Sequence, residues 1–217
     1  MNPQSSTDDS LVLSYLGLRK AIGLIGMTLP FVLAFGKVAF ESPGLQSSVS
    51  AYYYTVMRDV FVGSMCALAV FFMSYRGYEP QDARAGKLAC VFALGVALFP
   101  AAPLGSMIVH ERIVGTVHLL CALGFFLTLA YFPLALFRKT NPAAAPTPRK
   151  LQRNAVYTAC GYTILACIAL VIVVKLDDWD MAHPALTPVF WLEAVAIEAF
   201  GLSWITKGEA ILQDESS

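Results

Sequence analysis

The sequence predicts an all-α membrane protein, a bundle of six transmembrane helices. The chain has 217 residues, of which 57% are hydrophobic and only 14% are charged, and its mean hydropathy is +0.63. A soluble domain of this size needs more charged side chains to cover its surface. The apolar residues gather into six stretches, and the basic residues fall mainly in alternate connections between them. These three observations together favour a polytopic helical bundle.

A helix needs roughly 20 apolar residues to cross the hydrocarbon core of a bilayer. Five stretches meet this length directly, and the second must borrow residues from the turn that precedes it. The expected spans are at about residues 21–40, 56–75, 88–109, 113–137, 155–174 and 185–206, between terminal segments 1–20 and 208–217.

The sequence before the first apolar stretch and the prolines within the third indicate how these two helices begin and end. Residues 1–10 are polar and slightly acidic, so no basic segment precedes the first stretch. We therefore interpret that stretch as a retained span and not as a cleaved signal peptide. Pro100 and Pro103 lie inside the third stretch, where they should end or kink the helix toward its outer end.

The distribution of basic residues predicts the orientation. With the N-terminus inside, eleven basic residues lie on inner segments and four on outer segments. Because basic residues near span ends set orientation, we expect a multi-pass protein of the bacterial inner (plasma) membrane with both termini cytoplasmic. The inner loop 138–153, rich in Pro and Ala, is typical of a flexible linker. The eleven are Arg19, Lys20, Arg76, Arg84, Lys87, Arg138, Lys139, Arg149, Lys150, Arg153 and Lys207, and the four are Lys37, Arg58, Arg112 and Lys175.

Charge and cysteine content limit the partners. The formal net charge is zero, so we expect membrane lipids and not nucleic acid as partners; a homo-oligomer is compatible with this composition. All five cysteines fall inside apolar stretches and none has a CxxC partner. We interpret them as small apolar packing residues.

Two carboxylates in the last apolar stretch are the strongest functional signal. Glu193 and Glu198 interrupt an otherwise uncharged span. A carboxylate at the bilayer centre costs roughly 2.5–3.5 kcal/mol on insertion scales, so such residues usually have a role. Five residues correspond to about 140° around a helix, so the two side chains should face different neighbours.

Depth along the helices, at ~1.5 Å per residue, places several polar side chains together. Glu193 and His118 fall in the outer halves of their spans, and Glu198 falls near the midplane as a separate buried carboxylate. We therefore predict a polar pocket, open to the outer side, that binds a lipid headgroup or a small polar ligand. Its candidate residues are Asp59, Arg58, His118, Glu193, Arg112 and Tyr54.

Four of the candidates also have a structural interpretation. Arg58 and Asp59 could be interfacial charges that pin a helix end, and Tyr54 could belong to an aromatic belt. His118 could be a neutral histidine bonded to a neighbouring hydroxyl or carbonyl group.

Two other functions would use the same residues. A metal-dependent intramembrane hydrolase would hold a divalent metal with His118, Asp59 and Glu193 and use a bound water as nucleophile, although no span carries paired histidines. A proton-coupled transporter would use Glu193 and Glu198, although no repeat relates the two halves of the chain. We favour the binding function, expect no cofactor and assign no catalytic residue.

Four segments carry a resemblance to known proteins: SVSAYYYTVMRDVFVG, MSYRGYE, FALGVALFP and FWLEAVAIEAFGLSWITKGE. They resemble segments of a group of bacterial six-span membrane proteins without an assigned activity. The overall plan is also similar to the DRAM/Sfk1-type six-span superfamily, in which a Ser-containing outer segment leads into a span with an aromatic–Val start. Here Ser48 and Ser50 precede Val60 and Phe61. The resemblance implies a role in membrane and lipid homeostasis, but no reaction.

Overall fold

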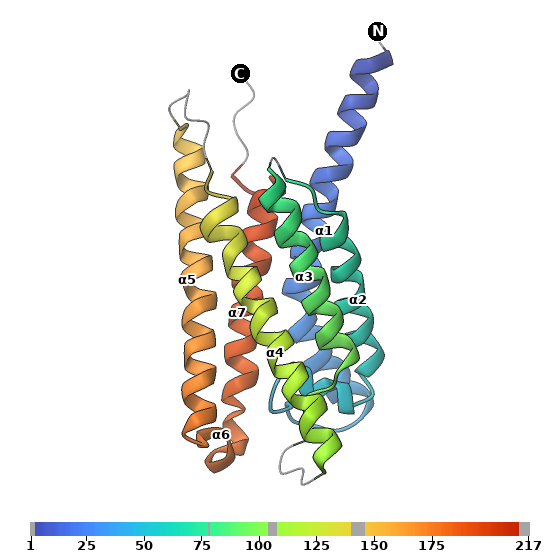
Figure 1. Cartoon of the computed structure of the whole chain (residues 1–217), viewed down its shortest axis with the longest axis vertical. Coiled ribbons are helices and arrows are strands. Elements are labelled where there is room, and N and C mark those ends of the chain that lie inside the picture. Colours follow the sequence, from blue (N-terminus) through green and yellow to red (C-terminus); the bar gives the residue numbers. More distant parts are fainter. Residues whose placement is uncertain (1–2, 78, 104–107, 140–145, 213–217) are drawn as a thin grey trace.

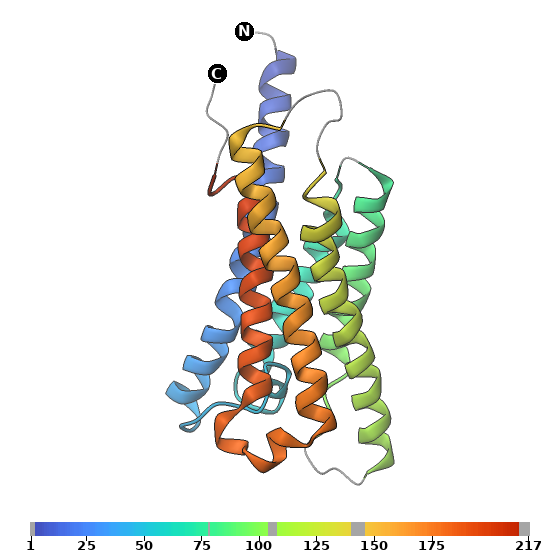
Figure 2. The ribbon, with the colours of Figure 1, turned by 90° about the vertical axis from the view of Figure 1, so that its left-hand side faces the viewer.

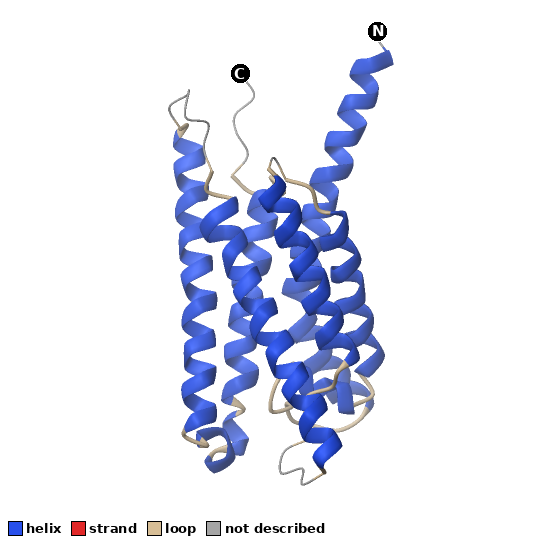
Figure 3. Ribbon diagram, in the orientation of Figure 1, coloured by secondary structure: helices blue, strands red, loops and turns tan. Residues whose placement is uncertain are grey.

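The computed structural model describes residues 3–77, 79–103, 108–139 and 146–212, with side chains from Tyr15 onward. This part of the chain is helical and contains no strand, which confirms the all-α prediction (Figure 3). The long helices are α1 (Pro3–Phe40), α2 (Arg58–Ser74), α3 (Pro80–Leu98), α4 (Val109–Tyr131), α5 (Pro148–Leu176) and α7 (Pro188–Lys207). The short elements are the 3₁₀ turns η1 (Ser50–Tyr54) and η3 (Pro184–Leu186), the π-turn η2 (Phe132–Leu136) and α6 (Trp179–Ala182).

The long helices stand side by side and form a closed bundle (Figures 1 and 2). Helix α7 packs against α1, α4 and α5, and further contacts join α1 to α2, α2 to α3, α3 to α4 and α4 to α5. Both chain termini lie at the same end of the bundle (Figure 1). We call this the terminal end, and the opposite end, which carries the α1–α2 connection, the cap end.

Four helical segments of the described chain are long and apolar enough to cross a membrane: Tyr15–Phe40, Val109–Leu136, Pro148–Leu176 and Pro184–Lys207. Large apolar side chains remain exposed along them, including Phe35 and Leu119, as expected where lipid is the solvent. Helix α2 has 17 residues, and α3 has 19 but carries three charged residues near its start. Crossing by these two helices therefore stays a prediction.

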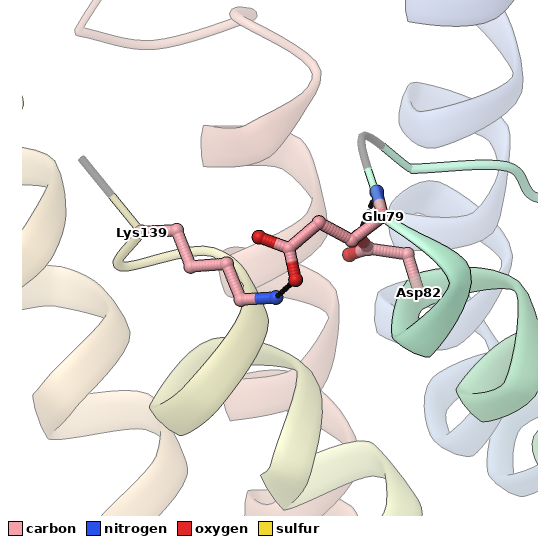
Figure 4. Close-up of polar contacts among 3 residues, drawn as sticks. All are labelled: Glu79, Asp82 and Lys139. Atoms are coloured by element: carbon pink, nitrogen blue, oxygen red, sulfur yellow. Dashed lines mark hydrogen bonds and ion pairs between the residues drawn. The ribbon is translucent and has the colours of Figure 1, made fainter. Parts of the chain in front are cut away.

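The third helix lies earlier in the chain than expected, at Pro80–Leu98 and not at 88–109. Pro80 occupies the first helical turn, and the Asp82 carboxylate accepts a hydrogen bond from the Glu79 amide at 2.9 Å. These features are typical of a helix start, and Pro100 prevents continuation past Phe99. Lys139 pairs with Glu79 at 2.8 Å, which joins the end of η2 to the start of α3 (Figure 4).

Glycines allow α1 and α7 to approach closely. A Cβ atom on Gly23 would lie 2.8 Å from the Gly201 carbonyl oxygen and 2.7 Å from Ile205. A Cβ atom on Gly26 would lie 2.8 Å from the Phe200 ring. These contacts are shorter than van der Waals separations, so the crossing depends on glycine, as in other tightly packed membrane helices.

An aromatic cluster fills the bundle core near the terminal end. The Trp204 ring is fully buried and its centroid lies 5.0–6.1 Å from those of five neighbours. The π-turn η2 brings two of these rings inward from one short segment, because its wider turn places Phe132 and Phe137 on the same side. The five neighbours are Phe72, Tyr75, Phe132, Phe137 and Phe200.

Candidate functional site: a capped cavity at Glu193

The segment between α1 and α2, residues 41–57, folds across the cap end and is called the cap here. The Phe190 amide of α7 donates a hydrogen bond to the Ser47 carbonyl oxygen at 3.1 Å. The buried Tyr52 ring packs on Phe190, with centroids 6.0 Å apart. Two contacts of different kinds therefore hold the cap to the first turn of α7.

Glu193 makes the third contact between the cap and α7. Its Oε2 atom accepts a hydrogen bond from the Val49 amide at 2.7 Å, and the Ser50 amide lies alongside. These amides open the 3₁₀ turn η1, where unpaired N–H groups favour a negative charge. Lys175, at the end of α5, adds a favourable electrostatic interaction with the Glu193 carboxylate. Glu193 is thus a capping group contributed by a distant helix.

A small cavity of about 40 Å³ lies inside the bundle beneath the cap. Four long helices besides α7 contribute to its wall, and Ser50 and Glu193 are the polar side chains that line it. The remaining wall is apolar. The lining residues are Gly26, Leu29, Val49, Ser50, Phe61, Met65, Leu68, Val96, Ala122, Phe125, Phe126, Leu129, Glu193, Ile197 and Phe200.

A second hollow, of about 170 Å³, lies between α4, α5 and α7. Three residues, Ala122, Phe126 and Glu193, line both hollows, so the two hollows are adjacent. The second hollow is a groove whose rim includes exposed apolar side chains of α4 and α5, among them Leu119 and Ile172. One hollow therefore lies inside the bundle and the other at its flank, and Glu193 lines both.

His118 contacts the end of α3 and not Glu193. Its Nδ1 atom lies 2.7 Å from the Phe99 carbonyl oxygen. A carbonyl oxygen can only accept, so Nδ1 carries the proton and donates. The ring is 5% exposed and satisfies a carbonyl group at a helix C-terminus. This agrees with the structural interpretation of His118, bonding to a neighbouring carbonyl.

The predicted residues near the start of α2 lie on the surface of the cap end. Arg58 is exposed and stacks over the Tyr53 ring, with its Cζ atom 4.3 Å from the centroid. Asp59 is exposed in the first turn of α2, where a carboxylate complements the helix dipole. Tyr54 donates a hydrogen bond to the Ala101 carbonyl oxygen at 2.7 Å. Burial, followed by the nearby Glu111 carboxylate, raises the pKa of Tyr54, which keeps its hydroxyl group a donor.

The remaining candidates are also dispersed. Arg112 is exposed on α4. Glu198 lies on the same face of α7 as the exposed residues Val195 and Leu202, and its buried Oε1 atom has no hydrogen-bond partner among the described residues. Within the same residues, no group of three His, Cys, Asp or Glu side chains could hold a metal ion. The predicted polar pocket is therefore represented by Glu193 alone, in apolar surroundings.

Sequence reasoning missed the partners of Glu193. A backbone amide carries no residue-type signal, so Val49 could not be recognised. Lys175 stands among the predicted outer bases, and its ion pair with Asp180 orders the α5–α6 turn beside the groove. The hollows beside Ala122 and Phe126 gave no sequence signal either, because an alternation of small and large side chains is typical of ordinary helix packing.

Comparisons with known proteins identify no relative: no family model, no curated protein and no solved structure matches this chain.

Proposed function

We propose that this chain is an integral membrane protein that binds an amphiphilic, lipid-like ligand in the paired hollows at Glu193. In this proposal α1, α2, α3, α4, α5 and α7 all cross the bacterial inner membrane, with the terminal end cytoplasmic. The 17 residues of α2 are within the roughly 17–25 that a tilted or thinned span uses. The excess of basic residues on inner segments supports the orientation.

We infer the class of ligand from the exposed apolar rim of the groove between α4 and α5. Leu119, Leu123 and Ile172 are 63%, 37% and 45% exposed and line the groove. They lie on the flanks of two helices long enough to span a bilayer, so a ligand entering here comes from the hydrocarbon region and must carry an apolar chain.

The side chain that the two hollows share defines the headgroup. Glu193 is the charged side chain among the residues that line the two hollows, and a carboxylate accepts hydrogen bonds. The matching headgroup therefore donates hydrogen bonds through a hydroxyl or amine group.

The test is native mass spectrometry of the protein purified in a mild detergent. We expect about one retained amphiphile per chain, because the two adjacent hollows share Glu193. Ala122→Phe fills the junction between the hollows and should abolish retention. Ala169→Phe is the matched control, because Ala169 is exposed on α5 and lines neither hollow. Equal retention by the two variants would refute the proposal.

The resemblance to six-span proteins agrees with a role in membrane and lipid homeostasis. The hydrolase and transporter alternatives draw on the same carboxylates, but no specific observation favours them. His118, Asp59 and Glu193 each lie in a different environment, and Glu193 and Glu198 face different surroundings on α7.

A further inference from the structure

One face of α7 is left uncovered by the rest of the bundle. Helix α7 lies between α1 and α5 and packs against both (Figure 2). Trp191, Val195 and Leu202 are nevertheless 51%, 48% and 38% exposed, and Glu198 is half-buried beside them. These four residues follow one another at intervals of four, three and four positions, so they form a single stripe along the helix. We call this stripe the α7 seam.

The α7 seam faces away from the hollows. Glu193, which lines both hollows, is five positions from Glu198, or about 140° around the helix. Glu198 itself lines neither hollow. A contact made by the seam is therefore separate from ligand binding at Glu193. It rests on α7 crossing the membrane, as the length and composition of the helix allow, and not on the ligand.

Glu198 makes the seam an unfavourable surface to leave against lipid. It lies ten residues after Pro188 and nine before Lys207, the ends of α7. At the helical rise this is about 14–15 Å from each end, close to the centre of a hydrocarbon core about 30 Å thick. Its buried Oε1 atom has no hydrogen-bond partner among the described residues. Lipid chains offer no hydrogen bonds, so the carboxyl group needs a partner from outside the chain.

The spacing of the seam fits a second helix. Alternating intervals of four and three positions are those of the contact residues in a coiled coil, where two helices pack along their length. A single polar residue among such apolar contacts fixes the register and the number of helices. Glu198 has this place, between Val195 and Leu202. The seam therefore fits a helix that carries a polar group at the depth of Glu198.

A second copy of this chain meets that requirement. Two copies inserted in the same orientation are related by a two-fold axis perpendicular to the membrane, so their α7 helices run parallel and each seam residue lies opposite its own counterpart. Glu198 then faces Glu198 at equal depth. Hydrocarbon favours the neutral form of a carboxyl group, which both donates and accepts a hydrogen bond. Two such groups are complementary to each other.

We propose that the α7 seam is the interface of a homodimer, in which the Glu198 carboxyl groups of the two copies hydrogen-bond to each other. Packed helices lie roughly 8–10 Å apart, a separation that two flexible glutamate side chains at the same depth can bridge. Val195 and Leu202 pack against their counterparts on either side of this pair. Trp191 extends the contact by one turn toward the cap end.

Energy transfer between fluorophores measures this dimer in the full-length protein. Chains that carry a donor or an acceptor at the C-terminus are mixed in phosphatidylcholine liposomes, and the protein-to-lipid ratio is lowered until the complex dissociates. Native mass spectrometry counts the copies in the complex. We expect two. Monomers at every ratio, three or more copies, or a different protein bound in place of the second copy would overturn the proposal.

Substitutions of Glu198 test the hydrogen-bonded pair. Glu198→Leu removes the polar group but keeps an apolar side chain in the seam. It should weaken dimerisation roughly tenfold, the ratio that ~1.4 kcal/mol produces, which is within the range measured for polar pairs between membrane helices. Glu198→Gln keeps both a donor and an acceptor and should retain most of the affinity. Equal affinities of the two variants would show that no hydrogen bond joins the copies and would overturn the proposal.

A bulky substitution tests the seam independently of Glu198. Val195→Trp should hold the two helices apart about one turn from Glu198 and weaken dimerisation by a similar factor. Val91→Trp is the matched control, because Val91 is exposed on α3, which packs mainly against α2 and α4. Equal weakening by these two variants would place the contact elsewhere and overturn the proposal. Monomers of the unmodified chain would overturn it even if a variant does not fold.

Discussion

The Glu193 carboxylate accepts a hydrogen bond from the Val49 amide, 144 positions earlier in the chain. The same carboxylate lines the cavity beneath the cap and the groove between α4 and α5. One side chain therefore closes the cap and presents its carboxyl group to the proposed ligand site. A headgroup bound at Glu193 would share the carboxylate with the cap.

Loss of this carboxylate should destabilise the fold. We expect Glu193→Ala to lower the free energy of unfolding by ~1–3 kcal/mol, because it leaves buried amides without an acceptor. Glu193→Gln retains an acceptor oxygen and should cost less than half as much. Thermal unfolding in detergent measures both. Glu198→Ala is the control, since Glu198 Oε1 has no partner within the described chain; equal losses at the two positions would contradict this role of Glu193.

His118 should behave as a structural donor. His118→Ala leaves the Phe99 carbonyl oxygen without its partner and should cost ~1–3 kcal/mol. His183→Ala should change stability by less than ~0.5 kcal/mol, because His183 is exposed. Nitrogen NMR of the imidazole rings provides an independent check, with the proton of His118 expected on Nδ1. A proton found on Nε2 alone would be incompatible with the Phe99 contact.

Glycine at the α1–α7 crossing should resist substitution. Gly23→Ala introduces a methyl group 2.8 Å from the Gly201 carbonyl oxygen, and such overpacking typically costs ~1–3 kcal/mol. Gly17→Ala, on the same helix, meets nothing within 4 Å and should be neutral or stabilise by ~0.5–1 kcal/mol. Thermal unfolding of the two variants decides the point, and equal stabilities would indicate that the crossing can relax.

Labelling of single cysteines in intact cells tests α2, α3, α4 and α5 as spans, and their orientation. An impermeant thiol reagent should label Val56→Cys, Ile108→Cys and Asp177→Cys and should not label Gln81→Cys or Pro146→Cys. All five positions are exposed, so the pattern reports the side of the membrane. Labelling of Pro146→Cys would reverse the orientation, and identical labelling of Val56→Cys and Gln81→Cys would remove α2 as a span.

Composition was sufficient to predict an all-helical chain, because apolar runs separated by charged connections have few other folded forms. It was less informative about α3. Asp82, Arg84 and Lys87 lowered the apolar signal at the true helix start, and the apolar segment after Leu98 extended the predicted span into the Pro100 region. Start signals at Glu79, Pro80 and Asp82 were present in the sequence and outweigh hydropathy there.

The site depended on information that residue types do not contain. Depth along each helix placed Glu193 and His118 at a similar level, but side-chain direction decides contacts. His118 points to the end of α3, Arg58 lies over Tyr53 and Glu193 bonds a backbone amide. Arg19 and Arg153 are buried, whereas in the sequence they were interpreted as determinants of orientation.

The attachment of the cap to α7 has a consequence for the order of assembly. The cap follows α1, but Phe190 and Glu193, which hold it, belong to α7. Glu193 leaves the ribosome 144 residues after its partner Val49, so the cap cannot adopt its native hydrogen bonds until α7 has left the tunnel and entered the bundle. The interior cavity is consequently sealed only after α7 has packed, and a chain arrested before Phe190 would carry an unsealed bundle.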